Sequence, residues 1–232
     1  MGRKKYVIFA SGGSGRRMGS DVPKQFLPLG GVPVLQRSIE LFLDACPDVS
    51  VVTVLPEGQE AYWRKLCLER DFDCRQTLVV GGITRFHSVR RALEKVPDGA
   101  VVAVHDGVRP LVSRDLVREM FRRMESCRAL IPVCPVTDTL KCLAPDADGV
   151  LRPAGTDPDR SCLYGAQTPQ MFWSEDLKAA YTQAFDLSFT DDASVAARYG
   201  IPLSYIAGER NNLKITTPED LELARAILSL RV

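Results

Sequence analysis

The chain has 232 residues, of which 45% are hydrophobic and 25% are charged, and its 30 basic and 29 acidic side chains leave a formal net charge of +1. This composition is typical of a globular protein with a sizeable core, and the charge balance excludes a general nucleic-acid-binding or membrane-binding surface. The amino terminus lacks the long apolar core of a secretory signal, so we expect a cytoplasmic protein whose partners include neither nucleic acid nor membrane.

The first predicted strand, residues 6–9, leads into the most distinctive stretch of the chain. Small residues follow the strand, and basic residues follow the small ones: Ser11, Gly12, Gly13 and Gly15, then Arg16, Arg17 and Lys24. Glycine lets backbone N–H groups approach an anion closely, and arginine and lysine add full positive charge. Residues 6–26 therefore predict a phosphate-binding loop.

Apolar runs and helical patterns then alternate along the chain. Further strands are predicted at 51–55, 77–80, 100–104 and 129–133, with helices at 33–43, 58–69, 88–96 and from Ser113 to about 124. Strands that lack polar alternation and are separated by helices indicate a mainly parallel sheet covered on both faces. Because ligands bind beyond the carboxyl ends of such strands, we expect the loops 11–24, 81–88 and 105–109 to meet at one edge.

The pattern changes at residues 137–163, which are rich in proline and show no helical period. A stretch of this length without helices predicts a functional excursion, here an extended hairpin arm that pairs with a second subunit. Helices at 174–185, 190–199 and from Pro218 onwards, and a strand at 203–206, complete the chain. We expect one α/β domain over 1–232, a Rossmann-like three-layer sandwich with a mainly parallel sheet and 137–163 as a protruding dimerisation arm.

Two common types of glycine loop do not fit. A dinucleotide fingerprint would require glycine where Met18 stands, and a Walker loop would require Gly-Lys-Ser/Thr. The pattern G-x-G-x-R-M-G…P-K instead resembles the sugar-nucleotidyltransferase superfamily. Seven blocks extend the likeness across the chain: GSGRRMGSDVPKQFLPLGG from residue 13, GG-x-x-R-x-x-SV at 81–89, HDGVRP at 105–110, DTLK at 138–141, QTPQMF at 167–172, TDDAS at 190–194 and NNLKITTPEDL at 211–221. Together they resemble the 2-C-methyl-D-erythritol 4-phosphate cytidylyltransferase family.

This resemblance implies a homodimeric enzyme that uses CTP, a divalent cation (usually Mg²⁺) and a polyol phosphate, and releases pyrophosphate. By this resemblance, Arg17 and Lys24 bind the triphosphate and stabilise the charge that develops at the α-phosphorus. Lys214 orients the attacking phosphate of the polyol. Such a transfer depends on in-line positioning and charge neutralisation and requires no side-chain nucleophile.

The resemblance also assigns the binding residues. The nucleotide is expected to contact Ser11, Gly12, Gly13, Gly15, Arg16, Gly82 and Ser88. The polyol phosphate is expected to contact Asp106 and Arg109, although Asp106 could instead ligate the metal. From the arm, Thr139 and Arg160 are expected to complete the neighbouring subunit's site, whereas Thr168 contacts substrate within its own subunit. A packed or turn-stabilising role is expected for His105.

Some positions leave alternatives open. Common members of the family have Pro-Ala-Ala-Gly where this chain has residues 10–13. They also have HDAARP where this chain has HDGVRP with Val108, and Trp where this chain has Tyr164. At positions 108 and 164 this chain looks similar to the sibling D-ribitol-5-phosphate cytidylyltransferases. The motif at 138–141 and the pair Asp159–Arg160 favour the erythritol substrate. A non-catalytic nucleotide-binding module is a further alternative, but it would be expected to have lost Arg17, Lys24 or Lys214.

Overall fold

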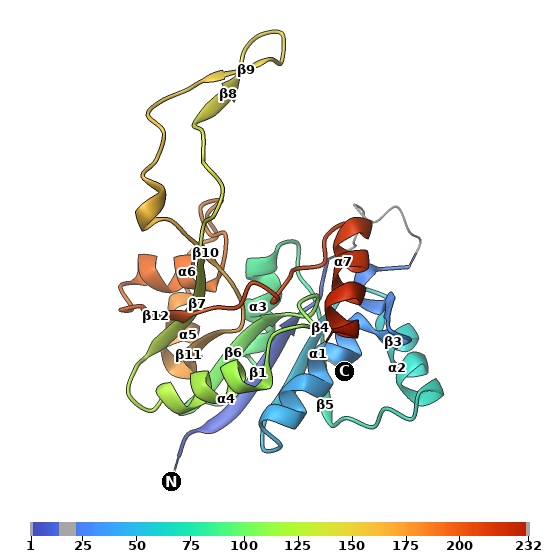
Figure 1. The fold of residues 1–232 in the computed structure, drawn as a ribbon. Helices are drawn as coiled ribbons and strands as arrows, with labels where there is room; N and C mark the ends of the chain where they lie inside the picture. The colour runs from blue at the N-terminus through green and yellow to red at the C-terminus, as the bar shows by residue number, and fades with distance from the viewer. Residues whose placement is uncertain (1, 14–21, 231–232) are drawn as a thin grey trace.

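The computed structural model describes residues 2–13 and 22–230, and a mixed sheet forms its centre (Figure 1). Eight strands take the order β10–β7–β11–β6–β1–β4–β5, with β12 paired to β7. Their bounds are β1 Lys4–Ala10, β4 Ser50–Leu55, β5 Gln76–Val80, β6 Ala100–Asp106, β7 Ala129–Pro135, β10 Tyr164–Ala166, β11 Gln170–Trp173 and β12 Ser204–Ala207. Strands β5, β4, β1 and β6 are mutually parallel, so their carboxyl ends lie at one edge.

Helices cover both faces of this sheet. Successive residues of β1 point to opposite sides: Phe9 packs in one core cluster with residues of α1 and α4, and Ile8 packs in another with residues of α3, α5 and α6. The bounds are α1 Val34–Ala45, α2 Glu60–Glu69, α3 Arg85–Leu93, α4 Arg114–Arg123, α5 Ser174–Ala180, α6 Asp192–Tyr199 and α7 Pro218–Ser229. The predicted three-layer α/β fold with a mainly parallel sheet is confirmed.

A third, smaller core cluster lies beside the carboxyl edge of the sheet. In this cluster α7 packs on the short pair β2 (Pro28–Leu29) and β3 (Val32–Pro33), and Leu29, Val108 and Ile215 are buried together. The one-turn helix η2 (Lys24–Phe26) immediately precedes β2. This packing fixes the segment around Ile215 close to the turn that follows β6.

Most predicted elements are present, and two predictions were wrong. The expected helix at 174–185 ends at Ala180, where the Thr182 N–H donates to the carbonyl of Ala179 at 3.1 Å and the Gln183 side chain donates to the carbonyl of Ala180 at 2.8 Å. No strand was predicted at residues 170–173, but they form β11, inserted antiparallel between β6 and β7. The apolar run 171–173 is too short to distinguish a strand from the start of a helix by periodicity.

Residues 137–163 project from the β7–β10 side of the sheet as a long excursion (Figure 1). Strands β8 (Leu143–Pro145) and β9 (Leu151–Pro153) pair antiparallel, and the one-turn helix η3 (Arg160–Cys162) precedes β10. The predicted hairpin arm is therefore confirmed, and its role in dimerisation stays a prediction. Among the described residues, none of the helices is long and apolar enough to cross a membrane.

Candidate active site

A cavity of about 340 Å³ lies where the carboxyl ends of β1 and β6 meet the loop after β5. Each of the three predicted loops contributes to its lining, and so does the segment before α7: Ser11, Lys24, Gly82, Ser88, Asp106 and Lys214. The convergence expected from the sheet topology is thus confirmed. A larger cavity of about 840 Å³ beside β7, β10 and β12 has no basic residue among the described residues of its lining, so it offers no cationic side chain to a phosphate.

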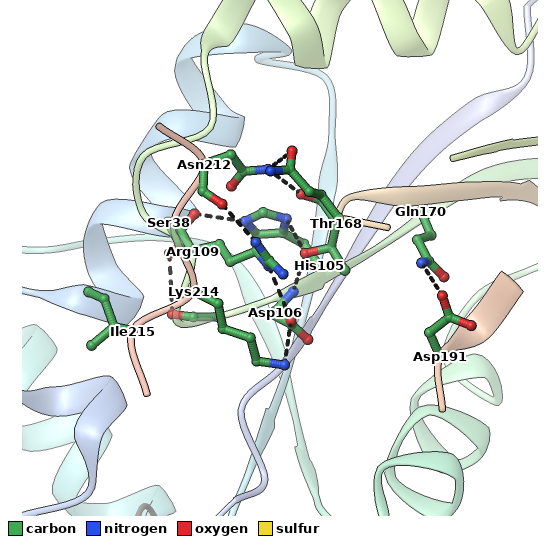
Figure 2. Close-up of polar contacts among 12 residues, drawn as sticks. Ser38, His105, Asp106, Arg109, Thr168, Gln170, Asp191, Asn212, Lys214 and Ile215 are labelled. Carbon is green, nitrogen blue, oxygen red and sulfur yellow. Dashed lines mark hydrogen bonds and ion pairs between the residues drawn. The ribbon is translucent and has the colours of Figure 1, made fainter. Parts of the chain in front are cut away.

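Asp106, the last residue of β6, is the charged centre of the site. Its side chain is 8% exposed, and its Oδ2 atom lies 2.9 Å from Lys214 Nζ and 3.4 Å from Arg109 Nε, as Figure 2 shows. Its Oδ1 atom lies 3.6 Å from Arg85 Nε. Burial alone would raise the pKa of this carboxyl, but Arg85, Lys214 and Arg109 outweigh burial and hold the pKa far below its ordinary value.

His105 and Thr168 lie next to Asp106 and support it (Figure 2). The Asp106 backbone N–H donates to Thr168 Oγ1 at 3.0 Å, and the Thr168 hydroxyl lies 3.1 Å from His105 Nδ1. His105 Nε2 is 3.0 Å from the carbonyl of Arg109, which can only accept, so Nε2 carries the proton and Nδ1 accepts from Thr168. The expectation that His105 stabilises the turn is confirmed, because the residue is fully buried and bonded within it.

This burial predicts a loss of stability in mild acid. Burial lowers the pKa of His105 to about 4, whereas histidine in an unfolded chain titrates near 6.5. The unfolded chain therefore takes up a proton first as the pH falls, and the free energy of unfolding should decrease between pH 6.5 and 4 by about 3 kcal/mol.

Urea unfolding at pH 7 and pH 4.5 measures this effect. The His105→Gln variant should be less stable than wild type at pH 7 but should lose less stability between the two pH values. An equal pH-dependent loss in His105→Gln and wild type would contradict the assignment.

The two lysines predicted to act on phosphate come from segments far apart in the chain. Lys24 Nζ donates to the carbonyl of Ile215 at 3.1 Å, directly beside Lys214. Ile215 N–H donates to the carbonyl of Val108 at 2.9 Å, and Arg109 Nη1 donates to the carbonyl of Asn212 at 2.7 Å. These bonds hold residues 212–215 against the turn after β6, so that both lysines line one cavity.

On the other side of the cavity, small residues leave the backbone accessible. The Ser88 hydroxyl accepts from Gly82 N–H at 3.0 Å and donates to the carbonyl of Thr84 at 2.9 Å, which fixes the loop before α3. A Cβ at Gly82 would lie 2.5 Å from His87 Cβ, so only glycine fits there. These contacts hold the loop before α3 in one conformation, with Gly82 and Ser88 at the cavity wall.

Other predicted residues lie elsewhere. Thr139 and Arg160 are exposed on the arm and do not line the cavity, and Arg160 Nη1 donates to the carbonyl of Thr137 at 2.7 Å. Thr168 is buried, and its hydroxyl bonds Asp106 and His105. The predicted residues Gly15, Arg16 and Arg17 lie outside the described residues.

Two residues with clear roles in the site had no role in our sequence interpretation. Gln25 is buried, and its amide donates to the carbonyls of Ser11 at 3.0 Å and Gly13 at 3.4 Å, which shapes the start of the glycine loop. Arg85 contacts Asp106. The signals for both were present, since Gln25 follows Lys24 and Arg85 is the arginine of the block at 81–89, but side-chain contacts between distant loops cannot be read from spacing.

Comparison with known proteins gives a consistent result. Residues 5–230 match the family model described as IspD, 2-C-methyl-D-erythritol 4-phosphate cytidylyltransferase. The chain is 45% identical over 231 residues to the enzyme of that name from Porphyromonas gingivalis, covering 99% of this chain and 100% of the relative, and 40% identical over 225 residues to that from Symbiobacterium thermophilum, covering 96% and 92%. The crystal structure of the enzyme of that name from Thermus thermophilus superposes with a TM-score of 0.75 at 32% identity, covering 99% of this chain and 100% of that one.

Proposed function

The chain belongs to the IspD family, 2-C-methyl-D-erythritol 4-phosphate cytidylyltransferase, and from this membership we propose a role for each residue of the site. The activity is the CTP-dependent formation of 4-diphosphocytidyl-2-C-methyl-D-erythritol and pyrophosphate, a step of non-mevalonate isoprenoid biosynthesis. The relatives at 40–45% identity carry the name of the erythritol enzyme, which favours this substrate over ribitol 5-phosphate.

CTP occupies the cavity with its base towards the loop after β5 and its phosphates towards the lysines. Ser11, Gly12, Gly82 and Ser88 read the cytosine and ribose. Gly13, with the glycine and arginines at positions 15–17, receives the triphosphate. The support for this orientation is chemical, because Ser11, Gly12, Gly82 and Ser88 are small and uncharged, whereas Lys24 and Lys214 bring positive charge to the same cavity.

The reaction is an in-line displacement. An oxygen of the substrate's own phosphate attacks the α-phosphorus of CTP, a new P–O bond forms, and the bond to the bridging oxygen breaks so that pyrophosphate leaves with the electron pair. Lys24 and Arg17 stabilise the charge that develops at the α-phosphorus, and Lys214 orients the attacking phosphate. Asp106 and Arg109 hold the polyol phosphate, and Thr168 contributes by fixing the backbone of Asp106.

A magnesium ion would be held mainly by the triphosphate rather than by the protein. The described residues contain no group of three histidine, cysteine or acidic side chains able to hold a metal ion, and both oxygens of Asp106 face cationic side chains. Mg²⁺ usually keeps substrate phosphates and waters as ligands and takes only one or two carboxylates from the protein. Bound in this way, the ion would neutralise charge on the phosphates, while Asp106 remains paired with Arg85, Arg109 and Lys214.

The arm completes the site of a second subunit. It carries exposed apolar side chains, with Leu143 46% and Leu151 63% exposed, which an extended segment surrounded by water would not be expected to keep uncovered. Thr139 and Arg160 lie on this arm and outside the cavity of their own subunit. A homodimer with exchanged arms covers the apolar residues and brings Arg160 to a partner's phosphate.

The observation that carries the function is the placement of Lys24, Asp106 and Lys214 around one cavity, with Arg109 paired to Asp106. A pyrophosphate-release screen of the four ribonucleoside triphosphates, each with methylerythritol phosphate or ribitol 5-phosphate, tests it. We expect turnover with CTP and methylerythritol phosphate that exceeds every other combination at least about 100-fold, because a site built to bond particular polar groups rejects analogues strongly. Turnover on ribitol 5-phosphate instead would change the substrate, and no turnover with any pair would indicate a non-catalytic nucleotide-binding module.

A further inference from the structure

A buried carboxylate outside the reaction described above lies next to the site. Asp192, the first residue of α6, is 0% exposed, and both of its oxygens are occupied. Arg85 Nη2 donates to its Oδ2 at 2.6 Å, and the hydroxyl of Tyr181 donates to its Oδ1 at 2.6 Å. A buried carboxylate is costly unless it is paired and hydrogen-bonded, and here both conditions are met.

Arg85 connects this carboxylate to the site. While one of its terminal nitrogens bonds Asp192, its Nε atom lies 3.6 Å from Oδ1 of Asp106, and its side chain lines the cavity. The opposite oxygen of Asp106, Oδ2, is the one that faces Lys214 and Arg109. The carboxylate of Asp106 is therefore held between two sets of cations, one on each oxygen.

The far end of this chain of contacts is rigid. Tyr181 is 2% exposed and stacks on Phe86 with ring centroids 4.7 Å apart, and Phe86 directly follows Arg85 at the start of α3. Burial raises the pKa of Tyr181 well above its ordinary value, so its hydroxyl remains a donor to Asp192. The planar guanidinium of Arg85 cannot rotate freely while Asp192 holds one end of it.

We propose that Tyr181 and Asp192 are positioning residues that fix Arg85, and that Arg85 in turn holds Oδ1 of Asp106 so that Oδ2 is presented to Lys214. Without Asp192, the Arg85 guanidinium is free to take both oxygens of Asp106 and to displace the Lys214 ammonium. The inference rests on the proposed role of Lys214 in orienting the attacking phosphate. Four residues thereby control one catalytic lysine: Arg85 of α3, Tyr181 directly after α5, Asp192 of α6 and Asp106 of β6.

The isosteric change Asp192→Asn tests the proposal. We expect kcat to fall about 10- to 100-fold, the usual effect of removing a partner that orients a reacting group. The KM for CTP should stay within about twofold, because the displaced group acts on the other substrate. Asp176→Asn is the matched control: it breaks a similar ion pair, with Arg128, at the start of α5 away from the cavity, and its kcat should match that of wild type.

A double-substitution cycle separates positioning from a general structural effect. If Asp192 acts through Arg85, the double variant Arg85→Gln/Asp192→Asn has the same kcat as Arg85→Gln alone. The double variant should also unfold at a higher temperature than Arg85→Gln alone, because that single variant leaves the buried carboxylate of Asp192 without its cation. Multiplied losses of kcat in the double variant would overturn the proposal.

Tyr181→Phe extends the test to a variant that removes one hydrogen bond and no charge, so it folds even where a charge variant does not. Its kcat should fall about threefold or more, and an unchanged kcat would overturn the proposal. Wild-type turnover in the same assay distinguishes this failure from a failure of the proposed function, because without the function wild type itself would release no pyrophosphate from CTP and methylerythritol phosphate.

Discussion

The Lys24→Ala variant is expected to lose kcat by a factor on the order of 10²–10³ while it keeps its fold. Lys24 is half-buried at the cavity wall, and its Nζ is placed beside Lys214 by a bond to the carbonyl of Ile215 at 3.1 Å. A fixed ammonium at this position stabilises negative charge that grows at the α-phosphorus in the transition state, so its removal should affect kcat more than the KM for CTP. Steady-state pyrophosphate release measures both constants.

Lys65→Ala is the matched control for this change. Lys65 is a 71% exposed lysine on α2, where it pairs with Glu69 at 3.6 Å, so removing its charge should leave kcat unchanged. Circular dichroism and thermal unfolding of both variants check that the fold persists. A Lys24→Ala enzyme with wild-type kcat would exclude Lys24 from transition-state stabilisation, whatever its affinity for CTP.

Mixing two inactive variants is expected to restore activity if the arm serves the neighbouring subunit. Arg160→Ala removes a guanidinium from the arm and leaves the cavity of its own subunit intact, whereas Lys24→Ala inactivates the cavity and leaves the arm intact. In a mixed dimer, the intact cavity of one subunit receives the intact arm of the other. Random exchange makes half of the dimers mixed, each with one working site, so roughly a quarter of wild-type activity should return.

The measurement requires each variant alone to be nearly inactive, and exchange can be ensured by unfolding and refolding the mixture. The control is a mixture of Lys24→Ala with Lys214→Ala, in which both defects affect the cavity and no recovery is expected. If Arg160 acts on its own subunit, the mixture of Arg160→Ala and Lys24→Ala also stays inactive. Sedimentation of the wild-type chain provides a second check, since a fully active monomer would contradict the exchange.

The local signals in this sequence were sufficient for most of the fold. The cap Ser113 and the capping box at Thr217 define helix starts because their side chains bond N–H groups within the same turn. The apolar runs that became β1, β4, β5 and β6 need only their own composition and the intervening helices to indicate a parallel sheet. β11 was missed because a three-residue apolar run becomes a strand only through its neighbours β6 and β7.

For the site, the residue types and the edge of the sheet at which they meet could be read from the amino-acid order alone. The glycine loop and Lys24 were identified from the residues themselves, the rule that parallel strands end together brought the loops to one edge, and the resemblance to the family added Asp106 and Lys214. The folded chain was needed to learn which charges share a partner: that Arg85 holds one oxygen of Asp106 and Lys214 the other, and that Asp192 holds Arg85. The reason is physical, because ion pairs between residues separated by about a hundred positions depend on side-chain directions and burial, which exist only after the helices have packed on the sheet.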